Sequence, residues 1–187
     1  MNRDTDPSLQ PSDDTGGMHM RILRGSVLVG AAAMMVLSAI PAGSATSTPS
    51  SNGHGGITLT NTNGDSVKRQ FSFSAVTKKD GTVTGTAELR NPSFDPVYRV
   101  QIDVSCLKVT GNVASFGGTV KHTTDPVFNN EFSQAFWTVV DNGEPGKNDT
   151  ISEMFFDNVV PPSSCQFITP TDFPQIPIEN GNVQVKP

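Results

Sequence analysis

The stretch that decides the fold is VYRVQIDVSCLKV, residues 97–109. From Tyr98 to Cys106 apolar side chains alternate with polar or charged ones, so the two sets face opposite sides of an extended chain. Alternation of this length predicts a long β-strand with one buried and one solvated face. After Cys106 the apolar residues Leu107 and Val109 continue one position late, which predicts a β-bulge at Cys106-Leu107.

The segments on both sides of this strand repeat the two-residue period. RQFSFSAVT at 69–77 alternates in the same way, and a KKDG turn leads into a return strand at 83–90. Further strands are predicted at 113–122, 132–140, 150–156 and 182–186. Seven or eight strands joined by short turns predict one all-β domain, either an antiparallel β-sandwich or a small β-barrel.

The first 45 residues have the order of a secretory signal peptide behind an N-terminal extension. Two arginines precede an apolar run of 16 residues, which Pro41 ends ahead of small residues. The run is shorter than the roughly 20 residues of a membrane-spanning helix, so cleavage after Ala45 is favoured over an uncleaved anchor. An acidic stretch ahead of the run indicates that the true start is Met18 or Met20. We therefore expect a secreted, extracellular protein without a membrane span after cleavage.

The exported part is expected to divide into a leader and a domain. Residues 46–66 begin with a run rich in Ser, Gly, Thr and Asn that has no apolar period, which predicts a flexible leader. The all-β domain then comprises residues 67–187. A chain of 187 residues fits one such domain plus tails.

Two cysteines are present, Cys106 and Cys165. An exported chain meets oxidising conditions, in which a cysteine pair normally forms a disulfide. A thiolate metal site is the alternative, but the pair lacks the CxxC spacing and a nearby histidine that such a site needs. We therefore predict one disulfide between Cys106 and Cys165.

The charge pattern argues against nucleic acid as a partner. The chain has a formal net charge of -5, and its basic residues occur in pairs such as Lys68-Arg69 and Lys78-Lys79, without a larger cluster. Proteins that bind nucleic acid gather Lys and Arg into patches that contact phosphates. An anionic membrane surface is an equally poor partner.

Catalytic signals are few in this sequence. His54 falls in the expected leader and His122 follows a predicted strand, so neither is placed as the base of a nucleophilic site. The candidates for a pair of carboxylates that hydrolyses sugars are Asp103, Glu131, Glu153 and Asp157. Asp103 lies on the polar face of the most regular strand, where a solvated role is the simpler reading. We therefore expect a protein without catalytic residues.

The loop DNGEPGKND, residues 141–149, contains Asp141, Glu144 and Asp149. Its spacing fails the regular calcium-loop pattern, although three carboxylates near backbone carbonyls offer an irregular calcium site. The simpler interpretation is a turn whose aspartates accept hydrogen bonds from backbone amides. We expect no cofactor, and keep calcium at these three residues as the minor alternative.

Two segments resemble a family of small exported bacterial β proteins of unassigned function. They are VQIDVSCLKVTGNVASFGGTV at 100–120 and VVDNGEPGKNDTISEMFF at 139–156. The shared features are a Cys-Leu strand, a Gly-Asn turn with a Gly-rich return strand, and a DNGEPG loop. The resemblance implies a secreted β fold and brings no catalytic residue.

Two functions remain open at this point. The first is a non-catalytic binding or surface-interaction module with an extracellular or cell-envelope partner of unknown identity. The second is a small β-barrel that carries an apolar ligand or acts on it as an isomerase or cyclase would. An internal cavity would favour the second function, and a filled core would favour the first.

Overall fold

A computed structural model of the chain describes residues 47–61, 63–126, 132–146 and 148–187. The expected signal peptide and the start at Met18 or Met20 lie outside the described residues. The elements are β1 (Ser50–Thr60), β2 (Ser66–Thr77), β3 (Val83–Asn91), β4 (Tyr98–Thr110), β5 (Val113–Thr123), β6 (Gln134–Val140), β7 (Thr150–Ser152), β8 (Phe155–Asp157), the 3₁₀ helix η1 (Pro162–Phe167), β9 (Gln175–Pro177) and β10 (Asn180–Lys186). Within this described part, no helix is long and apolar enough to cross a membrane.

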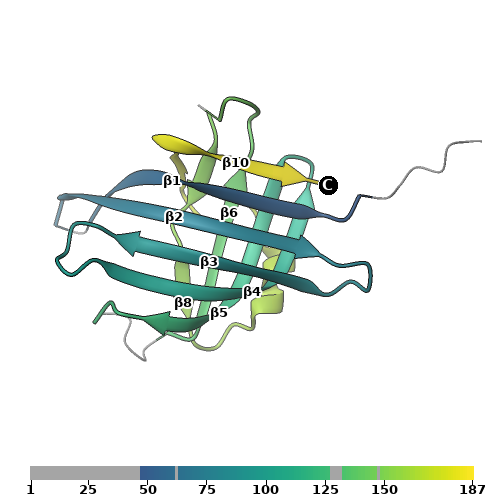
Figure 1. Cartoon of the computed structure of the whole chain (residues 1–187), viewed down its shortest axis with the longest axis horizontal. Helices are drawn as coiled ribbons and strands as arrows, with labels where there is room; N and C mark the ends of the chain where they lie inside the picture. The colour runs from purple at the N-terminus through teal and green to yellow at the C-terminus, as the bar shows by residue number, and fades with distance from the viewer. Residues whose placement is uncertain (1–46, 62, 127–131, 147) are drawn as a thin grey trace, which may run out of the picture. The chain divides into compact units, whose positions relative to one another are not determined.

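All the strands belong to one antiparallel sheet, in the order β10-β1-β2-β3-β4-β5-β6-β7-β9, with β8 paired to β6. Figure 1 shows β1, β2 and β3 side by side in the front layer, with β6 behind them. β9 and β10 lie at opposite ends of the strand order, yet only Ile178 and Glu179 separate them in the chain. The sheet therefore has to curl until its two ends meet.

The all-β prediction is confirmed, and the strands form one curled, barrel-like sheet. The described residues contain ten strands, more than the seven or eight predicted. The expected strand at 150–156 divides into β7 and β8, and the short β9 was not predicted. Three-residue strands of this kind have too few alternating positions to stand out in a sequence.

The flexible leader predicted for 46–66 is wrong for residues 50–60, which form β1 between β10 and β2. Its core-facing positions Gly53 and Gly55 lie opposite Phe73 and Phe71. A Cβ at Gly53 would lie 2.8 Å from the Phe73 ring. Here the phenylalanines of β2 fill the space over glycines of β1, so the first half of the strand packs on the core without apolar side chains of its own, while Ile57 and Leu59 contribute to the core in the second half.

The core lies between the two layers and is filled by aromatic rings. Phe73 of the front layer contacts Phe116 edge-on, with ring centroids 4.9 Å apart. Phe116 stacks on Trp137, with centroids 4.7 Å apart, and both side chains are fully buried. Rings of this size each bury a large apolar area, so they stabilise the interior and leave little room for a ligand.

β4 carries the predicted bulge, one residue earlier than expected. The register with β5 shifts between Val104 and Cys106, so Ser105 is the extra residue. The sequence pattern placed Cys106 on the same face as Val104, which is wrong. Because the bulge precedes Cys106, its side chain faces away from the core, towards η1, while Leu107 returns to the core.

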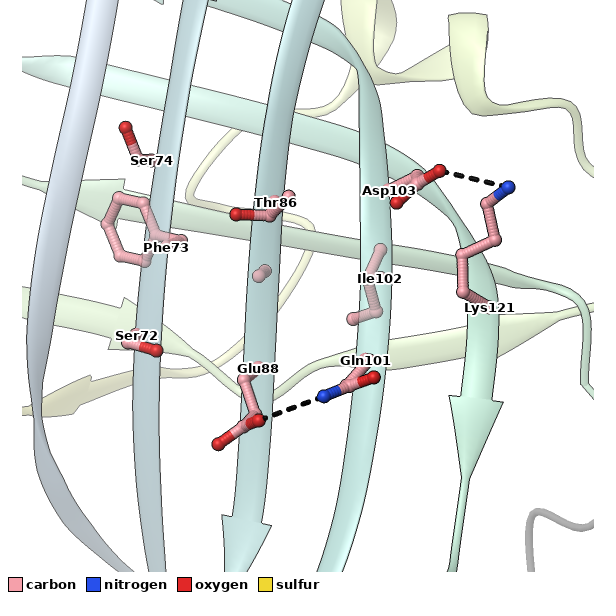
Figure 2. Close-up of a pocket in the computed structure, with 10 residues that line it drawn as sticks. Ser72, Phe73, Ser74, Thr86, Glu88, Gln101, Ile102, Asp103 and Lys121 are labelled. Carbon is pink, nitrogen blue, oxygen red and sulfur yellow. Dashed lines mark hydrogen bonds and ion pairs between the residues drawn. The ribbon is translucent and has the colours of Figure 1, made fainter.

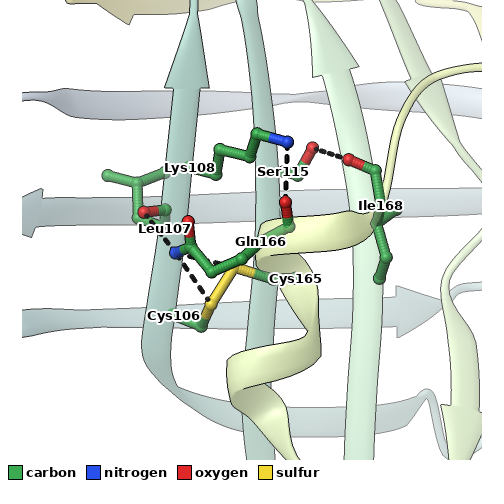
Figure 3. The surroundings of a disulfide bond; sticks show 7 residues. All are labelled: Cys106, Leu107, Lys108, Ser115, Cys165, Gln166 and Ile168. Atoms are coloured by element: carbon green, nitrogen blue, oxygen red, sulfur yellow. Dashed lines mark hydrogen bonds between the residues drawn. A yellow bond between two sulfur atoms is a disulfide. The ribbon is translucent and has the colours of Figure 1, made fainter.

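The predicted disulfide between Cys106 and Cys165 is confirmed, and it attaches η1 to the outer face of β4. Figure 3 shows hydrogen bonds on both sides of it. Lys108 Nζ donates to the Gln166 carbonyl at 2.6 Å, and Ser115 Oγ donates to the Ile168 carbonyl at 2.9 Å. The segment therefore covers one part of the sheet's outer face permanently.

Gly117 and Gly118 of β5 lie at points of close backbone approach. A Cβ at Gly117 would lie 2.1 Å from the Pro162 carbonyl oxygen, and one at Gly118 would lie 2.5 Å from the Asp103 carbonyl oxygen. Only glycine lets η1 pack this closely on β5.

Candidate functional site

The loop at 141–149 joins β6 to β7, and its carboxylates bind the last strand. Asp149 Oδ2 accepts the Val183 backbone N–H at 3.0 Å, and Asp141 Oδ2 accepts the Val185 backbone N–H at 2.9 Å. These N–H groups lie on the edge of β10 that does not pair with β1. The two carboxylates thus take the place of a neighbouring strand at an otherwise open edge.

Each aspartate also accepts a hydrogen bond from a backbone N–H group within the loop. Asp149 Oδ1 accepts the Asn142 N–H at 2.8 Å, and Asp141 Oδ1 accepts the Gly143 N–H at 2.9 Å. Glu144 Oε1 receives the side-chain amides of Asn182 and Gln184 at 3.0 and 3.1 Å. All three calcium candidates are therefore hydrogen-bond acceptors that attach β10. The simpler interpretation of the loop predicts backbone amides as partners of the two aspartates, but it does not predict the attachment of β10.

Calcium should not change the stability of this protein. In the described ranges, no three His, Cys, Asp or Glu side chains are placed to hold a metal ion together. Both oxygens of Asp141 and of Asp149 already accept backbone N–H groups, so a cation would have to compete with those donors for the same oxygens. We expect identical thermal melting curves in excess calcium and in chelator. A higher melting temperature with calcium would contradict this prediction and support a calcium site in the loop.

The other candidate residues are dispersed over the domain. His54 lies in β1 and His122 near the end of β5, both exposed. Glu131 lies outside the described residues. Backbone N–H groups of Val160 and Val159 hold the pKa of Asp157 below its usual value, so this carboxylate caps a turn. Asp103 and Glu153 line two different hollows of the domain.

A hollow of about 480 Å³ lies on the outer face of β2 to β5 (Figure 2). Its floor carries the exposed hydroxyls of Ser72, Ser74 and Thr86, contributed by neighbouring positions of β2 and β3. No hydrogen bond joins these three side chains to any other described residue. Phe73, Ala87 and Ile102, whose side chains belong to the core, complete the floor. The hydroxyls are thus free to bind a ligand.

Two charged pairs form the rim of this hollow. Lys121 Nζ lies 3.0 Å from Asp103 Oδ2 on one side. On the other side Arg90 donates to Glu88, and Gln101 Nε2 donates to Glu88 Oε2 at 3.3 Å. Each carboxylate of the rim is therefore already paired with a cation.

Glu88 is held in its ionised form by these neighbours. Burial raises the pKa of Glu88, but hydrogen bonds from Gln101 and Arg90 outweigh it, so the pKa lies below the usual value. A carboxylate of this kind stays charged near neutral pH and does not serve as a general acid.

A second hollow of about 330 Å³ continues the first across β2 and β1. It shares Ser72 and Glu88 with the first hollow and adds His54, Gln70 and Asn180. His54, Ser72, Glu88 and Gln101 are direct cross-strand neighbours, which places them in one row perpendicular to the strands. The polar face thus forms a continuous track over the front layer.

A third, apolar pocket lies between the layers at one end of the core. Its lining consists of Ile57, Leu59, Phe71, Leu89, Ile151, Met154 and Phe156, with Arg69, Ser152 and Glu153 as the polar members. Burial lowers the pKa of Arg69, and the charges of Asp125 and Glu153 oppose that shift. The cavity holds only about 60 Å³.

The polar face itself could be predicted from the alternation of β2, β3 and β4, but the hollow could not. A usable signal was the presence of small hydroxyl residues in SFS and TGT, next to longer side chains on β4. This signal predicts a hollow only when the strand register, which sets which residues lie side by side, is also known.

Comparison with known proteins does not assign this site. No family model, no curated protein and no solved structure matches the chain. The resemblance to exported bacterial β domains therefore stays a prediction.

Proposed function

We propose that this protein is a secreted, disulfide-bonded, non-catalytic module that binds a polar extracellular or cell-envelope partner through the outer face of β1 to β5. The observation that carries the proposal is the hollow of about 480 Å³, floored by hydroxyls that bind no other described residue. Its volume falls within the roughly 300–1,000 Å³ of ligand sites in proteins.

The arrangement of the polar row argues against nucleophilic catalysis. His54 and Ser72 are cross-strand neighbours, but no hydrogen bond in the described structure joins them. Glu88 lies on the other side of Ser72 from His54 and pairs with Arg90. A nucleophile needs a hydrogen-bonded base that an acid orients from behind, and this order of residues does not supply one.

Secretion is supported by two independent features. The disulfide needs an oxidising compartment to form and persist. The basic, apolar and small-residue order of the first 45 residues is typical of a signal peptide.

The small internal volume supports the binding module over the carrier function. The apolar pocket of about 60 Å³ is several times smaller than the roughly 300 Å³ at the lower end of ligand sites. The interior next to it is occupied by Phe73, Phe116 and Trp137. A carrier of lipid-sized molecules would need that volume to be empty.

A filled hollow should abolish binding. Thr86→Phe places a ring over the hydroxyl floor, so we expect at least a tenfold loss in binding of the exported full chain to isolated cell envelopes, measured by co-sedimentation. Phenylalanine suits an exposed strand position, so the fold should survive.

The matched control is Thr84→Phe, two residues away on the same face of β3 and outside both hollows. It should bind as the wild type does. Equal binding by the wild type and Thr86→Phe would reject the outer face as the site, and equal loss in both variants would indicate a general effect of added apolar surface.

A further inference from the structure

We propose that the outer-face track binds a neutral saccharide chain that runs across the strands. This inference rests on the proposed function, because it names the ligand of the same site. It follows from the charge balance of the rim, the chemistry of the floor and the direction of the polar row.

The charge balance selects a neutral ligand. Asp103 is paired with Lys121, and Glu88 is paired with Arg90, on opposite sides of the floor. A phosphate or carboxylate would have to compete with Asp103 for Lys121 and with Glu88 for Arg90. A cationic ligand would have to compete in the same way for each anion. Because the opposite charges of each pair already neutralise one another, the surface favours a ligand that is polar but uncharged.

The floor selects a ligand rich in hydroxyls. Ser72, Ser74 and Thr86 each present a hydroxyl that both donates and accepts hydrogen bonds. Sugar hydroxyls also both donate and accept hydrogen bonds. They can therefore pair with this surface whichever partner is the donor. A peptide adding as a strand is excluded here, because β2, β3 and β4 are already paired on both sides.

The row of polar residues sets the length of the ligand. The two hollows share Ser72 and Glu88, so the track extends from His54 on β1 to Lys121 on β5. Five strands at a spacing of about 4.8 Å span roughly 19 Å, which matches a short oligosaccharide rather than one ring. Aromatic stacking, the usual source of sugar affinity, is missing from the floor because the side chains of Phe71 and Phe73 point into the core. Binding of single sugars should therefore be weak and should increase with chain length.

The test uses the full chain, purified after export, on an array of printed oligosaccharides, where multivalent display compensates for weak binding. The neutral probes are gluco-, xylo-, manno- and chito-oligosaccharides of one to six units. The acidic probes are uronic-acid, sulfated and phosphorylated oligosaccharides. We expect a signal on neutral probes only, rising with length to about the span of the track, and at least a tenfold loss in Thr86→Phe but not in Thr84→Phe.

Binding to acidic probes alone, no binding to any neutral probe, or neutral binding that Thr86→Phe leaves intact would each overturn the saccharide inference. The envelope assay separates this failure from failure of the proposed function. If envelope binding depends on Thr86 while no neutral probe binds, the outer face is a site for another class of ligand. If envelope binding is also insensitive to Thr86→Phe, both proposals are wrong.

Discussion

Replacing both cysteines, Cys106→Ala with Cys165→Ala, should lower the free energy of unfolding by about 4 kcal/mol. The disulfide joins positions 59 residues apart, so its loss restores a large loop entropy to the unfolded chain. It also releases η1 from the outer face of β4. Urea unfolding of the oxidised wild type and of the double variant, followed by Trp137 fluorescence, measures the difference.

Ser115→Ala is the control for this prediction. It removes the hydrogen bond to the Ile168 carbonyl beside η1 but keeps the covalent link. We expect a loss of about 1 kcal/mol, as for a single hydrogen bond. If the double cysteine variant lost no more than Ser115→Ala, the disulfide would not be the main attachment of this segment.

Asp149→Asn should lower the free energy of unfolding by about 3 kcal/mol, although it changes the side-chain volume very little. Both carboxylate oxygens accept a backbone N–H, from Asn142 and from Val183, and the side chain is fully buried. An asparagine has one oxygen, so its NH₂ group would face one of these donors and leave it without a partner. Hydrogen exchange at the Val183 amide should speed up in parallel with the loss of stability.

Glu144→Gln is the matched control in the same loop. Glu144 is exposed, and a glutamine oxygen can still accept from Asn182 and Gln184. We expect a change within about 0.5 kcal/mol, as for most surface substitutions. A loss as large as that of Asp149→Asn would mean that the whole loop, rather than the buried carboxylate, carries the attachment of β10.

Much of the fold could be predicted because it depends on short-range patterns. The alternation in β2 and β4 is a local property, and it correctly indicated strands with one buried face. β1 was not predicted because two of its core-facing positions, Gly53 and Gly55, are glycines, whose burial comes from the phenylalanines of the next strand. The outward orientation of the Cys106 side chain was not predicted, because the sequence does not show which residue of a bulge is the extra one.

The candidate site, like the fold, could be predicted only in part from the sequence. Asp141 and Asp149 were recognised as acceptors at the ends of a polar loop, but their partners lie 44 and 34 residues further along the chain. The hollow depends on Ser72, Thr86 and Asp103 coming from three strands with one particular register. Neither arrangement has a signature within one segment.

By itself the sequence determined that this chain forms an antiparallel β domain with one disulfide, because strand alternation and cysteine pairing can be recognised within a segment or from composition. Only the tertiary structure decided that the DNGEPG loop attaches the last strand, that the core is filled, and that hydroxyls of neighbouring strands share one open floor. The physical reason is that burial and hydrogen bonding at these places are set by residues far apart in the chain, which the curl of the sheet brings together.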